Sequence, residues 1–187
     1  MWSEKGYRMA KNIILKKLEI TNYRSIKHQV LFFDGNSKIV GENRIGKTNT
    51  IDALYWLLTD KLLNGSKDIE QIKPLDDTKL TVRVDGTFLV DGKEIVISKE
   101  FAEEWVKTRG TEDLVMKGHT TTYYYNGVKQ GTKKQFDLLF NADFGLDKVK
   151  DYQGIDIIQF IVEFRCKWWI NQCCVIWKFG NRDAFNF

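Results

Sequence analysis

The sequence predicts an α/β fold with a mixed central sheet, one long helix and a peripheral antiparallel sheet. A short apolar strand over residues 37–40 runs straight into a glycine-rich loop, and from Lys47 to about Leu63 apolar side chains recur on one helical stripe. Further along, residues 80–85 alternate between apolar and polar side chains, which is typical of a sheet with one solvated face. Asp91-Gly92 then indicates a tight hairpin between two strands.

Apolar patterning and turn residues predict the remaining elements in order. Strands are expected over residues 13–20, 29–33, 37–40, 79–90, 93–101 and 121–125. Helices are expected over residues 47–63 and 133–140, with 146–152 as a third candidate. Asn64-Gly65-Ser66 is expected to end the first helix, because Gly and Asn favour the left-handed conformation that closes helices.

Composition divides the chain into three parts. We expect residues 1–11 to form a disordered N-terminal extension and residues 12–163 to form one folded lobe. Residues 164–187 hold many Trp and Phe, all three cysteines and no clear periodicity. Two interpretations of this atypical tail stay open: a segment that is buried against a partner, or an end at which the natural reading frame or domain is interrupted. The second is favoured.

Charge and cysteine usage narrow the class of protein. The chain has 187 residues with 43% hydrophobic and 29% charged residues, which suits a packed core rather than disorder. The net charge of +4 permits an anionic partner such as DNA without requiring one. The sequence has three cysteines and no secretory signal. It also has no run of the roughly 18 apolar residues that a membrane span needs. These features predict a cytoplasmic protein.

The segment Gly41–Thr48 fits the phosphate-binding pattern G-x-x-x-x-G-K-[ST] between a strand and a helix. Its glycines allow the backbone to wrap closely, so that N–H groups point at phosphate oxygens near the positive end of the helix dipole. Lys47 is expected to reach the β- and γ-phosphates, and the Thr48 hydroxyl is expected to bind magnesium. The sequence therefore predicts a site for a purine nucleoside triphosphate with Mg²⁺, and the loop pattern leaves adenine or guanine open.

Two segments resemble the SMC-like ABC ATPases of chromosome maintenance and DNA repair, which include the RecF, RecN and SbcC types. Leu18–Ser25 resembles their opening "L-x-I-x-N-[FY]-R-S". Val40–Asn43 followed by Gly46–Thr48 is similar to "V-G-x-N-G-x-G-K-[ST]". The resemblance implies the N-terminal lobe of an ABC-type P-loop head. Such heads close on ATP in pairs, bind DNA, carry coiled coils and in some cases work with a nuclease.

The resemblance also implies site residues beyond the loop. Arg24 and Ser25 would lie near the phosphates. Two interpretations of Gln159 stay open: a magnesium contact that senses the γ-phosphate, and an ordinary surface glutamine. The predicted nucleotide-binding set is Gly41, Glu42, Asn43, Arg44, Ile45, Gly46, Lys47, Thr48, Asn49, Arg24 and Ser25, and the predicted metal ligands are Thr48 and Gln159.

The sequence departs from the family pattern at several places. Arg44 stands where the family usually has glycine, and the chain contains no L-S-G-G signature, no apolar strand ending in Asp-Glu and no heptad run. We therefore expect an N-terminal fragment that binds ATP but hydrolyses it negligibly. Two alternatives stay open: a standalone, non-enzymatic module that binds a nucleotide or a partner ATPase and regulates it, and a small P-loop kinase.

Overall fold

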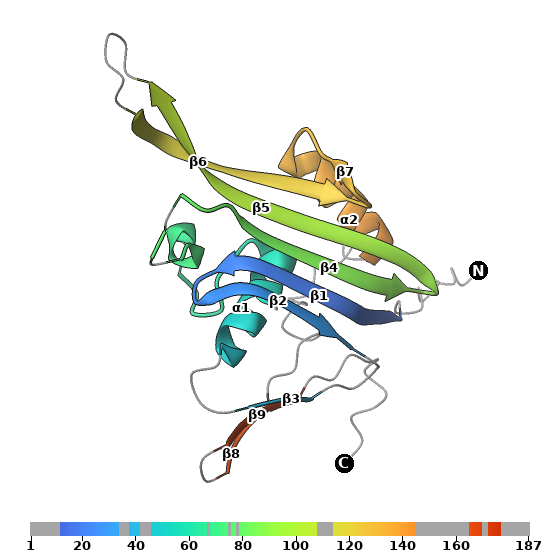
Figure 1. The fold of residues 1–187 in the computed structure, drawn as a ribbon. Coiled ribbons are helices and arrows are strands. Elements are labelled where there is room, and N and C mark those ends of the chain that lie inside the picture. Colours follow the sequence, from blue (N-terminus) through green and yellow to red (C-terminus); the bar gives the residue numbers. More distant parts are fainter. Residues whose placement is uncertain are drawn as a thin grey trace, which may run out of the picture.

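A six-stranded sheet forms the body of the lobe in this computed structural model (Figure 1). The strand order is β2-β1-β4-β5-β6-β7. The strands are β1 (Ile13–Tyr23), β2 (Ile26–Phe32), β4 (Val82–Val90), β5 (Lys93–Lys107), β6 (Leu114–Tyr125) and β7 (Val128–Lys129). The structure describes residues 12–33, 38–41, 46–66, 68–74, 76–77, 79–107, 114–144, 165–169 and 172–176, of which 38–41, 165–169 and 172–176 are described by their backbone alone.

Neighbouring strands of this sheet pair antiparallel in every case among the described residues. Tight turns account for several of these pairs, because a short connection can only join antiparallel strands. Asp91-Gly92 joins β4 to β5 with φ angles of 49° and 84°, and Asn126-Gly127 joins β6 to β7 with φ angles of 48° and 78°. These left-handed values are the ones that Asn, Asp and Gly tolerate best, so the predicted turn at Asp91-Gly92 is confirmed.

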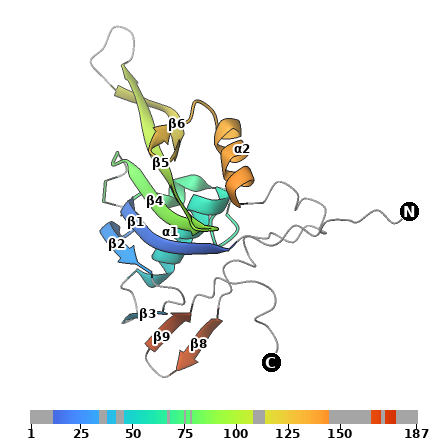
Figure 2. The ribbon, with the colours of Figure 1, turned by 90° about the vertical axis from the view of Figure 1, so that its right-hand side faces the viewer.

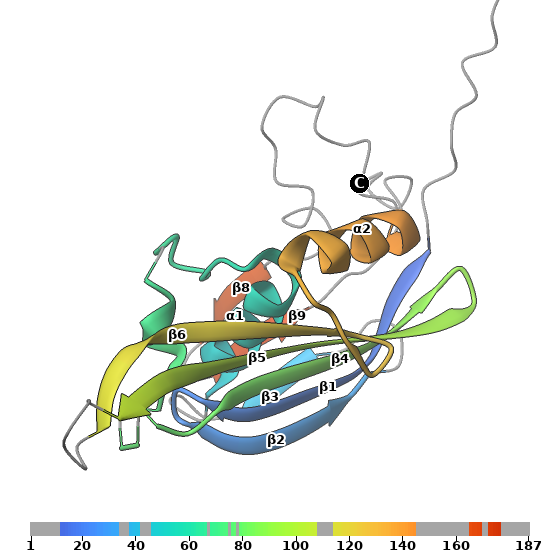
Figure 3. The ribbon, with the colours of Figure 1, turned by 90° about the horizontal axis from the view of Figure 1, so that it is seen from above.

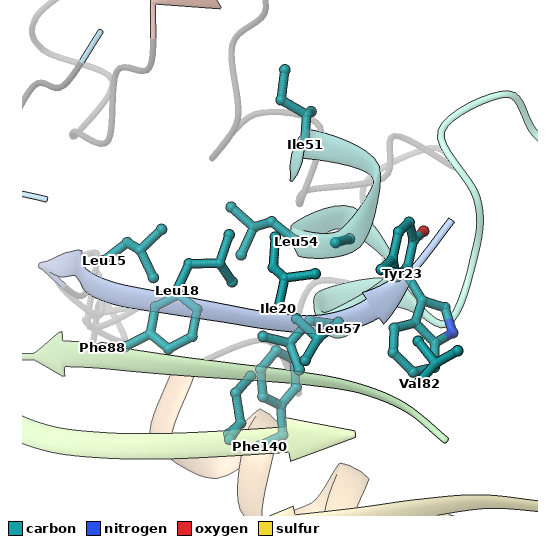
Figure 4. Close-up of a cluster of buried hydrophobic side chains, with 14 of the residues drawn as sticks. Leu15, Leu18, Ile20, Tyr23, Ile51, Leu54, Leu57, Val82, Phe88 and Phe140 are labelled. Carbon is teal, nitrogen blue, oxygen red and sulfur yellow. The ribbon is translucent and has the colours of Figure 1, made fainter. Parts of the chain in front are cut away.

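Both helices, α1 (Lys47–Thr59) and α2 (Lys133–Phe144), cover the same face of the sheet, as Figures 2 and 3 show. Side chains alternate along β4, where every second residue is buried. Val82 and Phe88 of β4, Leu18 of β1, and Leu54 and Leu57 of α1 lie in the same buried cluster (Figure 4). The predicted α/β class is confirmed, with both helices on one face of the sheet.

The first helix ends earlier than predicted. It stops at Thr59 rather than near Leu63, because Asp60 adopts a left-handed conformation with φ 59° and its N–H donates to Trp56 O at 3.0 Å. The Asp60 carboxylate accepts a hydrogen bond from Lys99 Nζ of β5 at 2.6 Å. This partner is distant in the sequence, so the local helix-stop signal at Asn64-Gly65-Ser66 predicted the wrong end.

Other element bounds differ by a few residues, and one short element was missed. The strands β1, β5 and β6 and the helix α2 extend beyond their predicted ranges, and a 3₁₀ helix, η1 (Ile69–Ile72), follows α1. The candidate helix over 146–152 and the N-terminal extension over 1–11 lie outside the described residues. No helix in the described ranges is long and apolar enough to cross a membrane.

A second, three-stranded sheet has the order β3-β9-β8. The strand β3 (Lys38–Gly41) leads into the glycine-rich loop, and β8 (Arg165–Trp169) and β9 (Gln172–Ile176) come from the atypical tail. Val40 pairs with Cys174 and Gly41 with Cys173 in antiparallel register. The tail segment thus supplies the strand that pairs with β3, while the boundary predicted at residue 164 stays a prediction.

Gly86 permits the close approach of α1 to β4. A Cβ atom there would lie 2.6 Å from Phe88 Cε2 and 2.7 Å from Leu57 Cδ2, and both side chains are buried in the core. Gly86→Ala should therefore lower the free energy of unfolding by about 1–3 kcal/mol through overpacking, measured by urea unfolding. Gly118→Ala in β6 is the control, because its Cβ would meet nothing within 4 Å. Equal losses in the two variants would contradict this account.

Candidate functional site

Gly46 connects the glycine-rich loop to the first turn of α1. Its φ of 91° lies in the left-handed region, where side chains other than glycine are strained. Thr50 N donates to Gly46 O at 2.9 Å, which begins the helix. Gly46 has no side chain that could cap the first N–H groups of α1, and a helix N-terminus of this kind favours an anion. The predicted start of the helix at Lys47 is confirmed.

Lys47 and Thr48 occupy the first turn of α1 in different environments. Lys47 is 7% exposed, whereas Thr48 is exposed to solvent. Gly41 is described by its backbone alone, and Glu42, Asn43, Arg44 and Ile45 lie outside the described residues, as does Gln159. The structure therefore describes the strand before the predicted loop and the helix after it.

The turn between β1 and β2 lies against the first turns of α1. Asn49 Nδ2 donates to Ser25 Oγ at 2.8 Å, and Arg24 Nη1 donates to Asn49 Oδ1 at 3.4 Å. Arg24 Nε also donates to Gln71 O at 3.0 Å. The structure thus brings together three of the predicted site residues, Arg24, Ser25 and Asn49, beside the helix turn that carries Thr48.

A buried carboxylate anchors this arrangement. Asp52 is 1% exposed, and its Oδ2 lies 2.7 Å from Arg24 Nη2. The same oxygen accepts a hydrogen bond from the Tyr23 hydroxyl at 2.9 Å, and Oδ1 accepts one from Leu63 N at 2.6 Å. Burial, followed by the nearby Asp52 carboxylate, raises the pKa of Tyr23, so the phenol stays protonated and donates to Asp52.

A second contact ties β2 to the start of α1. The Thr50 hydroxyl lies 3.0 Å from Gln29 Oε1 and 3.1 Å from Gly46 O. Neither Asp52 nor Gln29 was predicted as part of the site. One signal for Asp52 is present in the sequence: an acidic residue stands among the apolar residues Ile51, Ala53 and Leu54 of one helix. A carboxylate in such a position needs specific partners when it is buried.

Comparison with known proteins identifies relatives of this chain. Residues 14–160 match the AAA ATPase domain family. The DNA replication and repair protein RecF of Geobacillus thermodenitrificans is 36% identical over 90 residues, which cover 47% of this chain and 24% of that protein. The chromosome partition protein Smc of Chlorobaculum tepidum is 32% identical over 87 residues, which cover 38% of this chain and 7% of that protein.

A solved structure of the recombination mediator protein RecF with ATP aligns with 65% of this chain and 28% of that chain, at 24% identity and a TM-score of 0.49. The chain spans about a quarter or less of the length of the two curated relatives. The family match and these relatives confirm the resemblance to SMC-like and RecF-type ATPases that the sequence predicted. The chain belongs to the AAA ATPase domain family.

Proposed function

We propose that residues 41–48 form a phosphate-binding loop that holds ATP with Mg²⁺. The observation that carries this proposal is the left-handed Gly46, which joins the predicted loop directly to the N-terminus of α1. Helix N–H groups without side-chain caps attract the phosphate oxygens. Lys47, at the first helical position, adds a positive charge that suits the β- and γ-phosphates.

The residues next to the loop fit a magnesium–nucleotide complex. Thr48 is exposed in the first turn of α1 and offers a hydroxyl oxygen, which is the kind of ligand that Mg²⁺ prefers. When bound, the metal neutralises charge on the phosphates. Asn49 follows Thr48 in α1 and makes hydrogen bonds with Arg24 and Ser25 of the turn between β1 and β2. We infer that these three polar side chains support the triphosphate chain.

The proposed role of the whole protein follows its relatives. Because RecF is named for DNA replication and repair, and Smc for chromosome partition, we infer an ATPase head of a DNA repair or recombination protein in the cytoplasm. The partners inferred are DNA, bound weakly through basic residues, and a second head. A nuclease partner is inferred as well, from the sequence resemblance.

Magnesium dependence of ATP binding tests the proposal. Wild-type protein should bind ATP more tightly with Mg²⁺ than with a chelator, and Thr48→Val should reduce that difference by about tenfold, since valine keeps the shape but removes the oxygen ligand. Isothermal titration of each protein with and without Mg²⁺ measures this difference. Thr87→Val in β4 serves as the matched control and should behave as wild type. ATP binding that is insensitive to Mg²⁺ in the wild type would refute the proposed metal site.

A further inference from the structure

We propose that Asp52 is the positioning residue of the nucleotide site: its carboxylate holds the Arg24-Ser25 turn against the first two turns of α1. This inference rests on the proposed function, because it concerns how the ATP site is kept in shape. Asp52 lies one helical turn after Thr48, on the same side of α1. It therefore acts on the site through Arg24, without contacting the phosphates itself.

Asp52 joins three segments that are separate in the sequence. Its Oδ2 accepts from Tyr23 at the end of β1 and pairs with Arg24 in the turn. Its Oδ1 accepts from Leu63 N, beyond the end of α1. Figure 4 shows Tyr23 on the helix-facing side of β1, beside α1. A buried carboxylate keeps its partners in place strongly, because each lost partner leaves charge without compensation in a medium of low dielectric constant.

The turn that Asp52 holds has an unfavourable backbone. Arg24 has a φ of 51°, in the left-handed region that residues such as arginine rarely adopt, and Asn22 has a φ of 55°, which asparagine tolerates better. Arg24 N donates to Ile72 O at 2.8 Å, and its guanidinium lies between Gln71 O and Asp52. Strained residues of this kind persist where the surroundings over-determine them, and they cluster at functional sites.

Asn49 connects the Arg24-Ser25 turn to the proposed phosphate-binding end of α1. Its side-chain oxygen accepts from Arg24 and its nitrogen donates to Ser25, so one amide connects both residues of the turn. Asn49 is the next residue after Thr48. When the Asp52 carboxylate is lost, Arg24 loses its closest partner, and the polar group beside Thr48 loses its fixed orientation.

Binding of ATP–Mg²⁺ by single and double variants tests the proposal. Asp52→Asn and Arg24→Gln should each weaken ATP binding by about tenfold, the loss expected when one charge-assisted contact is misplaced. The double variant should be no weaker than the weaker single variant, because both changes disturb one unit. Tyr23→Phe is the matched control: it removes a partner of Asp52 but leaves the Arg24 contact. It should lower the midpoint of urea unfolding while ATP affinity stays within about twofold of the wild type.

Each outcome decides the question. Wild-type affinity in Asp52→Asn, fully additive losses in the double variant, or an equal loss of affinity in Tyr23→Phe would overturn the positioning role and leave the ATP site standing. No ATP binding by the wild type would overturn the proposed function and this inference with it. If Asp52→Asn does not fold, Arg24→Lys replaces it, because lysine keeps the charge but cannot contact Asp52, Asn49 and Gln71 O together. Unchanged affinity in that variant would also overturn the proposal.

Discussion

Lys47→Ala should weaken binding of ATP–Mg²⁺ by roughly 10- to 150-fold. The ammonium of Lys47 would make a charge-assisted contact to phosphate, and such contacts contribute about 1.5–3 kcal/mol. Gly46 places Lys47 at the first position of α1, next to the uncapped helix N–H groups. Titration of wild type and variant with ATP–Mg²⁺ in a calorimeter measures the loss directly.

Two controls separate this loss from a loss of folding. Lys47 is 7% exposed, so its aliphatic stem also packs. Lys47→Met keeps most of the stem and removes the charge, and it should lose as much affinity as the alanine variant. Lys61→Ala removes an exposed lysine just beyond α1 and should bind ATP as the wild type does. Equal affinities of the wild type and Lys47→Ala for ATP–Mg²⁺ would refute the proposed phosphate-binding loop.

Asp60→Asn should lower the free energy of unfolding by about 3 kcal/mol. The Asp60 carboxylate contacts Lys99 Nζ at 2.6 Å and also pairs with Lys133 at the start of α2. Lys99 is 1% exposed on the core face of β5 and also donates to Trp56 O at 3.2 Å. Removal of the carboxylate leaves a buried ammonium without its counter-charge. Asparagine tolerates the left-handed conformation of Asp60, so the measured effect reports the charge rather than backbone strain.

Lys99→Met is the matched comparison. It removes the buried charge, keeps most of the volume and leaves the partly exposed Asp60 carboxylate paired with Lys133, so it should cost much less stability than Asp60→Asn at pH 7. The double variant Lys99→Met/Asp60→Asn should lose much less stability than Asp60→Asn alone, because no unpaired ammonium remains. Urea unfolding of the four proteins gives the coupling energy. A double variant as unstable as the sum of its single changes would show that the two residues act independently.

The same pair predicts a dependence of stability on pH. Burial lowers the pKa of Lys99 to about 8 from 10.5, although Asp60 opposes the shift. Between these values the unfolded chain keeps the proton that the folded protein has lost, so the stability contributed by Lys99 should rise as pH increases from about 8 to 10. The difference between wild type and Lys99→Met in urea unfolding across this range isolates the effect. A constant difference would contradict the lowered pKa.

Local chemistry was sufficient to predict the elements that short-range rules govern. Asp91-Gly92 adopts the left-handed angles that a hairpin turn requires, and the strands on either side of it pair as expected. Gly46-Lys47 begins α1 where the loop pattern predicted. In each case the physical cause lies within a few residues, namely backbone sterics at glycine and the side-chain period of a strand or helix. The ATPase family was recognised from such local motifs as well.

Only the tertiary structure decided the features that depend on distant partners. The helix α1 ends at Thr59, where Asp60 adopts a left-handed conformation and contacts Lys99, which lies 39 residues away. Asp52 is buried against Tyr23, 29 residues away, and pairs with Arg24 in the turn that packs on α1. The conformation of a buried charged side chain depends on the groups that pack against it. The sequence shows only that the charged residue is present. The motif around Lys47 therefore predicted where the proposed site lies, whereas the contacts among Arg24, Ser25 and Asn49 required the fold.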